Sequence, residues 1–294
     1  MNQLQGDGRV FILYIIEKTQ PRHDILGVRR QPEEIMATAQ ASQQKSQGPS
    51  TASAEEVARF TAMAESWWDP HGKFRPLHQI NPVRIAYIRD HIAAHFDRDA
   101  LADEPLKGLK LLDIGCGGGL LCEPLSRLGA QVTGIDAGDR NIAIAKLHAE
   151  QSDLAIDYRH ILPEKMTAEI GSDFDIVLNM EVIEHVTDVD MFLKASTSLL
   201  KPGGIMFLST LNRTLKALAL AKIGAEYILR WLPIGTHDWK KFVKPSELAH
   251  GLRPNGVTIT DLAGVIYKPM ADEWQLSPTD LDVNYMAVAV KVAD

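Results

Sequence analysis

A cluster of glycines at residues 115–119 directly follows a short apolar run, and this junction constrains the fold more than any other stretch. Residues 109–114 carry four large aliphatic side chains, as a buried strand does, and residues 120–128 have a helix-like pattern. A strand that ends in glycines and leads into a helix lets the backbone approach a ligand closely, because no Cβ lies in the way. A tight strand-to-helix turn without a ligand is the alternative explanation.

The spacing of these glycines distinguishes two kinds of nucleotide-binding loop. The dinucleotide fingerprint G-x-G-x-x-G requires glycine at position 120 or 122, counted from Gly115 or Gly117, but leucine and cysteine stand there. The chain instead has Asp113 two residues before Gly115, and then glycine at every second position to 119. This pattern resembles the S-adenosylmethionine (SAM) loop of class I methyltransferases, and we expect Asp113, Gly115 and Gly117 to contact that cofactor.

A second carboxylate supports a cofactor site. Residues 131–136 have the pattern of the next parallel strand and end at Asp136. In nucleotide-binding βαβ units a carboxylate at this place accepts hydrogen bonds from the ribose hydroxyls. The alternative is an aspartate that caps the following helix. The loop and Asp136 together predict SAM binding.

Composition limits the class of protein and its partners. The chain has 294 residues with 45% hydrophobic and 23% charged residues, which is typical of a folded globular protein. Its formal net charge of −7 argues against nucleic acid as a partner. The two cysteines, Cys116 and Cys122, lie close together beside the glycines, so we expect no disulfide framework and a reducing, cytoplasmic setting.

The domain boundary is predicted near residue 53. Residues 1–52 include a stretch that is poor in large apolar side chains, and we expect a disordered N-terminal extension there, followed by one domain over 53–294. Ser53 and Glu56 have the spacing of a helix capping box. The aromatic and proline-rich residues 67–84 predict a lid loop, and Asn81-Pro82 predicts the start of a helix that continues to residue 95.

The remaining sequence alternates between strand and helix patterns. This alternation predicts a doubly wound, mostly parallel sheet whose ligand lies beyond the carboxyl ends of the strands. The expected strands are 109–114, 131–136, 155–160, 174–180, 204–210, 256–266 and 283–292, and the expected helices are 119–129, 139–150 and 188–200.

Two carboxylates and an imidazole follow the fourth expected strand. Glu181, Glu184 and His185 have i, i+3, i+4 spacing, so a helical turn would place them on one face. A divalent ion between them would relieve their repulsion, and this donor set suits Mg²⁺, Mn²⁺ or Fe²⁺ better than structural Zn²⁺. We take Mg²⁺ as the expected ion. The alternative is a solvated helix N-terminus whose acids favour the helix dipole.

These residues suggest two routes by which the acceptor oxygen could be activated for methyl transfer. Methyl transfer from the SAM sulfonium needs a nucleophile held in line, and a phenol is a poor nucleophile until it loses its proton. A metal chelated by a catechol would lower the phenol pKa and position the attacking oxygen. His185 or a glutamate acting as general base is the other route. The sequence alone does not choose between these two routes.

With these motifs in hand, the chain resembles the ubiquinone-biosynthesis O-methyltransferases over nearly all of residues 53–292. The stretches that carry the resemblance are Trp67-Trp68-Asp69, Phe74 to Arg84, Asp113 to Gly119, Ala145 to Ala149, Glu181 to Val186, Ser209 to Arg213, Gly224 to Arg230, Gly235 to Asp238 and Asp282 to Met286. The resemblance implies a class I methyltransferase, Rossmann-like fold with a seven-stranded sheet, an antiparallel last strand, N-terminal helices and a lid or membrane-facing insertion.

The family resemblance also implies roles for individual residues and a substrate class. SAM would contact Arg84, through its methionine carboxylate, together with Gly115, Asp136 and Met180. The metal ligands would be Glu181, Glu184 and His185. The implied substrates are polyprenylated phenols and catechols, 2-polyprenyl-6-hydroxyphenol and 3-demethylubiquinol, methylated at two pathway steps. A biosynthetic enzyme assembly is a further expected partner, although no interaction motif identifies one.

The segment 212–244 carries a local charge that opposes that of the whole chain. It holds seven basic residues and two acidic ones, beside a helical apolar stripe. Such a helix suits an anionic phospholipid surface, phosphatidylglycerol or cardiolipin, and we expect peripheral association with the inner membrane. An ordinary helix packed on the sheet is the alternative. For the whole chain, the competing functions are methylation of another phenol or of carbon, and SAM binding without turnover.

Overall fold

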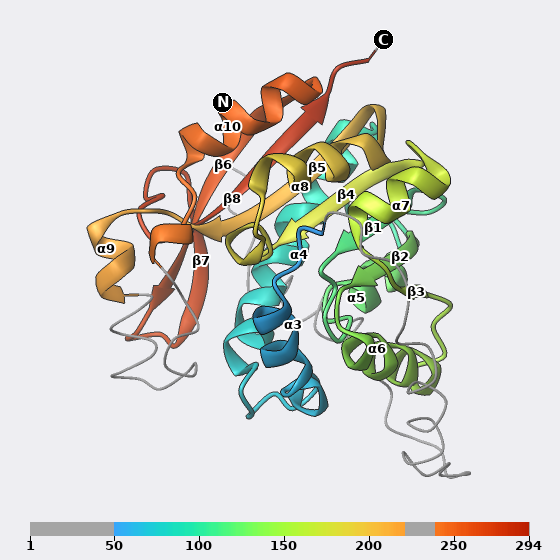
Figure 1. The fold of residues 1–294 in the computed structure, drawn as a ribbon, viewed down its shortest axis with the longest axis horizontal. Helices are drawn as coiled ribbons and strands as arrows, with labels where there is room; N and C mark the ends of the chain where they lie inside the picture. The colour runs from blue at the N-terminus through green and yellow to red at the C-terminus, as the bar shows by residue number, and fades with distance from the viewer. Residues whose placement is uncertain (1–49, 221–238, 294) are drawn as a thin grey trace.

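The computed structural model describes residues 50–220 and 239–293. They form an eight-stranded sheet covered by helices on both faces (Figure 1). The strands are β1 (Lys110–Ile114), β2 (Gln131–Asp136), β3 (Asp157–His160), β4 (Phe174–Met180), β5 (Leu200–Leu211), β6 (Val257–Lys268), β7 (Glu273–Ser277) and β8 (Asn284–Lys291). The α-helices are α3 (Ala54–Thr61), α4 (Arg75–His95), α5 (Cys122–Arg127), α6 (Asp139–Gln151), α7 (Pro163–Ile170), α8 (Val189–Leu199), α9 (Leu215–Ala217) and α10 (Pro245–Leu252). The predicted α/β class is confirmed.

The strand order β3-β2-β1-β4-β5-β8-β6-β7 creates a switch point between β1 and β4. Strands β1 to β5 run parallel to one another, and β8 lies antiparallel between β5 and β6. The predicted count of seven strands was one too low, because β7 pairs antiparallel with β6 and forms a hairpin with it at the edge of the sheet. A crevice at the carboxyl ends of strands beside such a switch point is where ligands bind in open α/β sheets.

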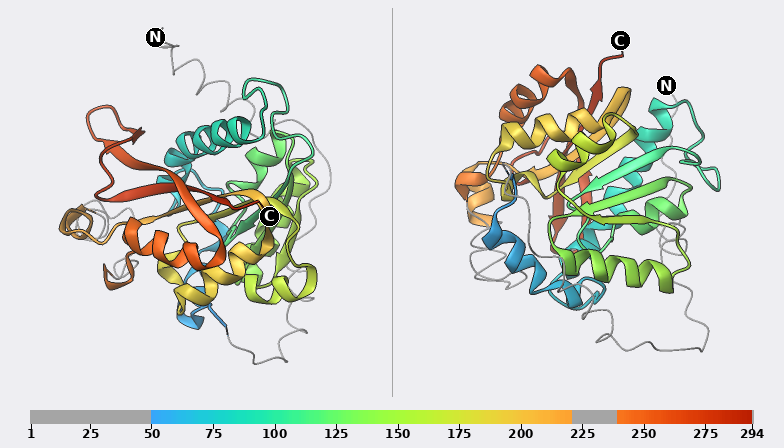
Figure 2. Two further views of the ribbon diagram at one scale, coloured as in Figure 1. Left: turned by 90° about the horizontal axis from the view of Figure 1, so that it is seen from above. Right: turned by 45° about the vertical axis from the view of Figure 1, so that its right-hand side comes forward.

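Two apolar cores explain why the central strands have continuous hydrophobic runs. Alternate residues of β4 point to opposite faces, with Ile176 in the core under α4, α5 and α6 and Val177 in the core under α7, α8 and α10. Strands buried on both faces need apolar side chains at every position. Figure 2 shows α4 on one side of the sheet and α8 and α10 on the other.

Helix α4 begins earlier than the sequence predicted. We expected a lid loop up to residue 84 and a helix start at Asn81-Pro82, but α4 runs from Arg75 and carries Pro82 inside it. An interior proline removes one backbone hydrogen bond and costs about 3 kcal/mol. Ile80, Asn81 and Arg84 are all buried, so the packing of this face offsets that cost.

The N-terminal part of the domain is attached at residues 51 and 52 to α7 and to the segment that precedes α8. Thr51 donates its backbone N–H to Glu164 at 2.9 Å and accepts a hydrogen bond from the backbone N–H of Thr187 at 2.9 Å. Ala52 forms an antiparallel bridge with Val186. The expected disordered extension therefore has its last residues inside the fold, while residues 1–49 lie outside the described part. Residues 221–238 of the predicted insertion also lie outside the described part.

Candidate active site

The glycine loop after β1 adopts a backbone that other residues rarely take. Gly115, Gly117 and Gly119 have φ angles of +74°, +53° and +88°. The backbone N–H groups of Gly115 and Cys116 both donate to the Ile135 carbonyl, at 2.8 and 3.0 Å, which ties the loop to β2. The loop is therefore fixed at the carboxyl ends of β1 and β2.

Asp136 ends β2 and is bonded to this loop. Its Oδ2 accepts from the Gly117 N–H at 3.0 Å, and its Oδ1 accepts from the Gly138 N–H at 2.7 Å and from Asn141 Nδ2 at 3.0 Å. Burial raises the pKa of Asp136, and these three hydrogen bonds oppose the shift. The structure thus brings together the two sequence features on which the SAM prediction rested.

Asp113 lies at the end of β1 and is 2% exposed. The Cys122 thiol donates to its Oδ2 at 3.2 Å. Burial raises the pKa of Asp113 to about 7. Both cysteines are free, buried thiols.

A cavity of about 740 Å³ begins at these groups and extends across the switch point. It is within the size range of small-molecule sites. The predicted site residues all line it: Arg84, Asp113, Gly115, Gly117, Asp136, Met180, Glu181, Glu184 and His185. One cavity therefore holds both the expected cofactor residues and the expected acid–histidine cluster.

Buried Arg84 and half-buried Glu181 form an ion pair, and both residues line this cavity. Glu181 has a φ of +59° and also accepts from Ser209 Oγ at 2.6 Å and Asn284 Nδ2 at 2.9 Å. Burial alone would raise the pKa of Glu181, but the Arg84 guanidinium and these two donors hold it below its usual value. Arg84 is 3% exposed, and its Nε is buried without a hydrogen-bond partner.

Glu184 and His185 lie in a short 3₁₀ turn, Ile183–His185, and face different partners. Glu184 Oε2 accepts from Thr210 Oγ1 at 2.9 Å, while its Oε1 is buried without a partner. Burial and the Glu181 charge raise the pKa of Glu184 to about 7. His185 Nδ1 lies 3.3 Å from Glu56 Oε2.

Two tryptophans lie against the glycine loop. Trp67 Nε1 donates to Asn141 Oδ1 at 3.0 Å, and Asn141 in turn donates to Asp136. Trp68 Nε1 donates to the Gly118 carbonyl at 2.9 Å, and its ring stacks on His148 with centroids 3.5 Å apart. The Trp-Trp motif therefore helps to hold the loop and its carboxylate in place.

Comparison with known proteins identifies the family. A family model described as a methyltransferase domain matches residues 85–262. Relatives from Paramagnetospirillum magneticum and Mesorhizobium japonicum, both called ubiquinone biosynthesis O-methyltransferase, are 58% and 57% identical over 241 and 242 residues. These alignments cover 82% of this chain and 96% of each relative. The chain belongs to the ubiquinone biosynthesis O-methyltransferase family. It is a SAM-dependent O-methyltransferase.

Solved structures of other methyltransferases share the fold. The magnesium protoporphyrin IX methyltransferase of Synechocystis PCC 6803, solved with bound SAH, has a TM-score of 0.52 at 22% identity and covers 81% of this chain and 93% of its own. The plantazolicin methyltransferase BpumL has a TM-score of 0.54 at 15% identity and covers 81% and 98%. At these identities the likeness shows the fold alone.

The predicted metal site of this family member is not supported. We expected Glu181, Glu184 and His185 on one helical face, but Glu181 precedes the 3₁₀ turn and pairs with Arg84, while Glu184 bonds to Thr210 and His185 faces Glu56. Within residues 50–220 and 239–293, no group of three or more His, Cys, Asp or Glu side chains is arranged to hold a metal ion. Glu181 already neutralises Arg84, so this donor set does not fit a divalent ion as it stands.

The sequence analysis missed two residues that line this cavity, Asn141 and Glu56. Asn141 had no visible signal, because its role depends on Trp67, which lies 74 residues away in the chain. Glu56 was assigned to a capping box with Ser53. Ser53 does cap α3, but the Glu56 side chain turns to His185 and Arg59 instead.

Proposed function

We propose that this enzyme methylates ring hydroxyls of polyprenylated phenols and catechols, at the 2-polyprenyl-6-hydroxyphenol and 3-demethylubiquinol steps of ubiquinone biosynthesis. The observation that carries the proposal is one cavity that is lined both by the glycine loop and Asp136 and by Arg84, Glu181 and His185. The names of the curated relatives support the pathway.

The residues present fit SAM in the part of the cavity that the glycine loop and Asp136 line. SAM supplies an electrophilic methyl group on its sulfonium when bound. Asp136 would accept hydrogen bonds from the ribose hydroxyls, because a carboxylate has about four lone-pair sites. The buried, unpartnered Nε of Arg84 is available to the methionine carboxylate, and Glu181 holds the guanidinium in place. Met180, at the end of β4 and 8% exposed, would be an apolar wall.

We assign proton removal from the acceptor hydroxyl to His185. The side chain of His185 is 15% exposed and lines the cavity, whereas Glu184 is 3% exposed and bonded to Thr210. Burial would raise the pKa of Glu56, but its interaction with His185 and nearby cations lowers it, so Glu56 stays ionised and orients the imidazole through Nδ1. A metal ion has no part in this scheme, because Arg84 already neutralises Glu181.

Transfer of labelled methyl from SAM to a short-chain catechol tests the function. We expect turnover with the wild type, a loss of about 10²–10⁴-fold in kcat for H185N, and a smaller loss for E56Q and E184Q. SAH affinity, measured by calorimetry, should stay unchanged in all three variants. Turnover of H185N at the wild-type rate would reject His185 as the base, and failure of clean wild-type protein to bind SAM or SAH would reject the whole scheme.

The membrane prediction for 212–244 remains a proposal and is modified by the structure. Arg213 pairs with Glu247, and Lys216 pairs with Asp280, so fewer free positive charges are present than the sequence count implies. Leu215 and Leu220 are 78% and 54% exposed and would supply apolar contact. No described helix is long and apolar enough to cross a bilayer.

Cosedimentation with liposomes tests peripheral association with the inner membrane. We expect binding to phosphatidylglycerol or cardiolipin liposomes that weakens as salt is added. Equal binding to neutral liposomes would contradict the electrostatic part of this proposal. The expected enzyme assembly stays a prediction.

A further inference from the structure

The cavity has a further part, lined by residues that the proposed contacts to the cofactor and to the methyl-acceptor oxygen do not use. Its walls there come from α4, with Leu77 and Ile80, and from the β6–β7 hairpin, with Val265 and Trp274. We call this part the hairpin arm. It is continuous with the cofactor end, so one molecule with a ring near Glu181 can extend into it.

The hairpin arm exists because of the strand that the sequence analysis missed. β7 pairs with β6 through Tyr267 and Trp274, whose rings lie 5.2 Å apart. The hairpin packs along α4, and Arg75 at the start of that helix lies 3.7 Å from Asp272 in the hairpin turn. Trp274 is half-buried and packs against the core cluster that contains α4.

The charges beside the hairpin arm are largely neutralised. Lys216 Nζ lies 2.8 Å from Asp280 Oδ2 and 3.3 Å from Asp282 Oδ2, and Lys216 and Asp280 both line the cavity. Lys73, also in the lining, is exposed, so its ammonium group stays in contact with water. A hydrocarbon chain gains free energy when it leaves water for such walls, whereas a charged ligand group would lose its hydration.

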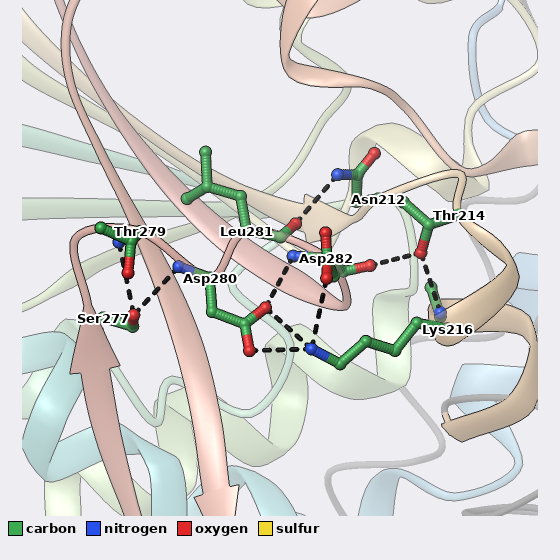
Figure 3. Close-up of polar contacts among 9 residues, drawn as sticks. Asn212, Thr214, Lys216, Ser277, Thr279, Asp280, Leu281 and Asp282 are labelled. Carbon is green, nitrogen blue, oxygen red and sulfur yellow. Dashed lines mark hydrogen bonds and ion pairs between the residues drawn. The ribbon is translucent and has the colours of Figure 1, made fainter.

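Hydrogen bonds fix the side of the cavity between α9 and β8. Figure 3 shows the segment after β5 joined to the loop before β8 by these ion pairs and by side-chain bonds to backbone carbonyls. Asn212 Nδ2 donates to the Leu281 carbonyl at 2.9 Å, and Thr214 Oγ1 donates to the Asp282 carbonyl at 2.5 Å. The wall is therefore held in place without a ligand, which favours binding by a preformed surface.

We propose that the hairpin arm is the binding site for the isoprenoid tail of the acceptor, with Trp274 as its specificity-determining wall. The inference rests on the proposed function, because the tail belongs to the substrate named there. The ring lies beside Glu181 and His185, and the first isoprene units extend between α4 and the hairpin.

Chain-length kinetics in detergent-free solution test the arm. The substrates are a tailless catechol and the same catechol with one or two isoprene units, all used without membranes so that lipid binding does not contribute. We expect kcat/KM to rise about tenfold or more with the first unit. W274Q should remove most of this gain and leave the tailless catechol and SAH affinity unchanged.

L276Q is the matched control. Leu276 lies on the same strand two residues from Trp274 and is half-buried against the same core cluster, but it does not line the cavity. We expect L276Q to keep the full tail preference. If W274Q fails to fold, L77Q replaces it as the test variant, because Leu77 lies on α4, the other wall of the hairpin arm.

Several outcomes would overturn the tail site. These are equal kcat/KM for tailed and tailless catechols in the wild type, equal losses in W274Q and L276Q, or a W274Q loss that also affects the tailless substrate. If no catechol of any length is methylated although SAH binds, the proposed function fails instead, so the two failures are distinguishable.

Discussion

Replacing Gly117 with alanine tests whether Trp67 closes on the glycine loop. A Cβ at position 117 would overlap the Trp67 ring and lie 2.5 Å from its Cη2. The indole is poorly able to move, because it stacks on Phe74 with centroids 3.8 Å apart and donates to Asn141. Alanine would also have to adopt a φ of +53°.

The expected loss has two parts. A left-handed backbone costs a non-glycine residue about 1–2 kcal/mol, and forcing a methyl group into a packed site costs about 1–3 kcal/mol. Gly256 separates them, since it has a φ of +71° and a Cβ added there would have no heavy atom within 4 Å. G256A therefore carries only the backbone cost, and G117A should lose about 1–3 kcal/mol more of the free energy of unfolding.

Urea unfolding of the cofactor-free protein measures both variants. A W67A background gives the methyl group room, so the loss of unfolding free energy caused by G117A should fall there to the backbone cost alone, while the loss caused by G256A should not change. Calorimetry should also show weaker SAH binding by G117A than by G256A. Equal losses in the two single variants, or additivity of W67A with G117A, would refute the close contact between Trp67 and the loop.

Three further predictions concern buried polar groups. In N141L, Asp136 loses a donor, and we expect SAH to bind about tenfold more weakly with kcat unchanged at saturating SAM, as titration calorimetry and initial rates would show. E181Q leaves the Arg84 guanidinium buried without its counter-ion and should cost about 3–5 kcal/mol in urea unfolding, against less than about 1 kcal/mol for the exposed control E65Q; equal effects would contradict this. Burial raises the pKa of Asp113 to about 7 from an unfolded value near 4, so its contribution to stability is present below about pH 4 and is lost as the pH rises through 7. Unfolding free energies between pH 5 and 8 should therefore fall more steeply for the wild type than for D113N. The same dependence of unfolding free energy on pH in both proteins would reject the raised pKa of Asp113.

The parts of the fold that the sequence predicted are those with local causes. Strands β1, β4 and β5 are buried on both faces, so their apolar runs are visible without tertiary information. The glycine loop and Asp136 belong to one βαβ unit, and their spacing alone places them together.

The parts that the sequence did not predict depend on distant partners. The Arg84–Glu181 pair joins residues 97 positions apart, and the Glu56–His185 contact joins α3 to the turn after β4. Local rules therefore assigned Glu56 to a cap and Glu181 to a metal ion. Pro82 predicted a helix start, since nothing near it in the chain shows that its neighbours face a core.

The attachment of Thr51 and Ala52 has a practical consequence for anyone who trims this protein. A fragment that starts at Ser53 would leave the carboxylate of Glu164 without its two donors and would uncover the backbone of Val186, one residue from His185. Deletions meant to remove the N-terminal extension should therefore stop before residue 50, and affinity tags cleaved at residue 53 would alter the wall of the active site.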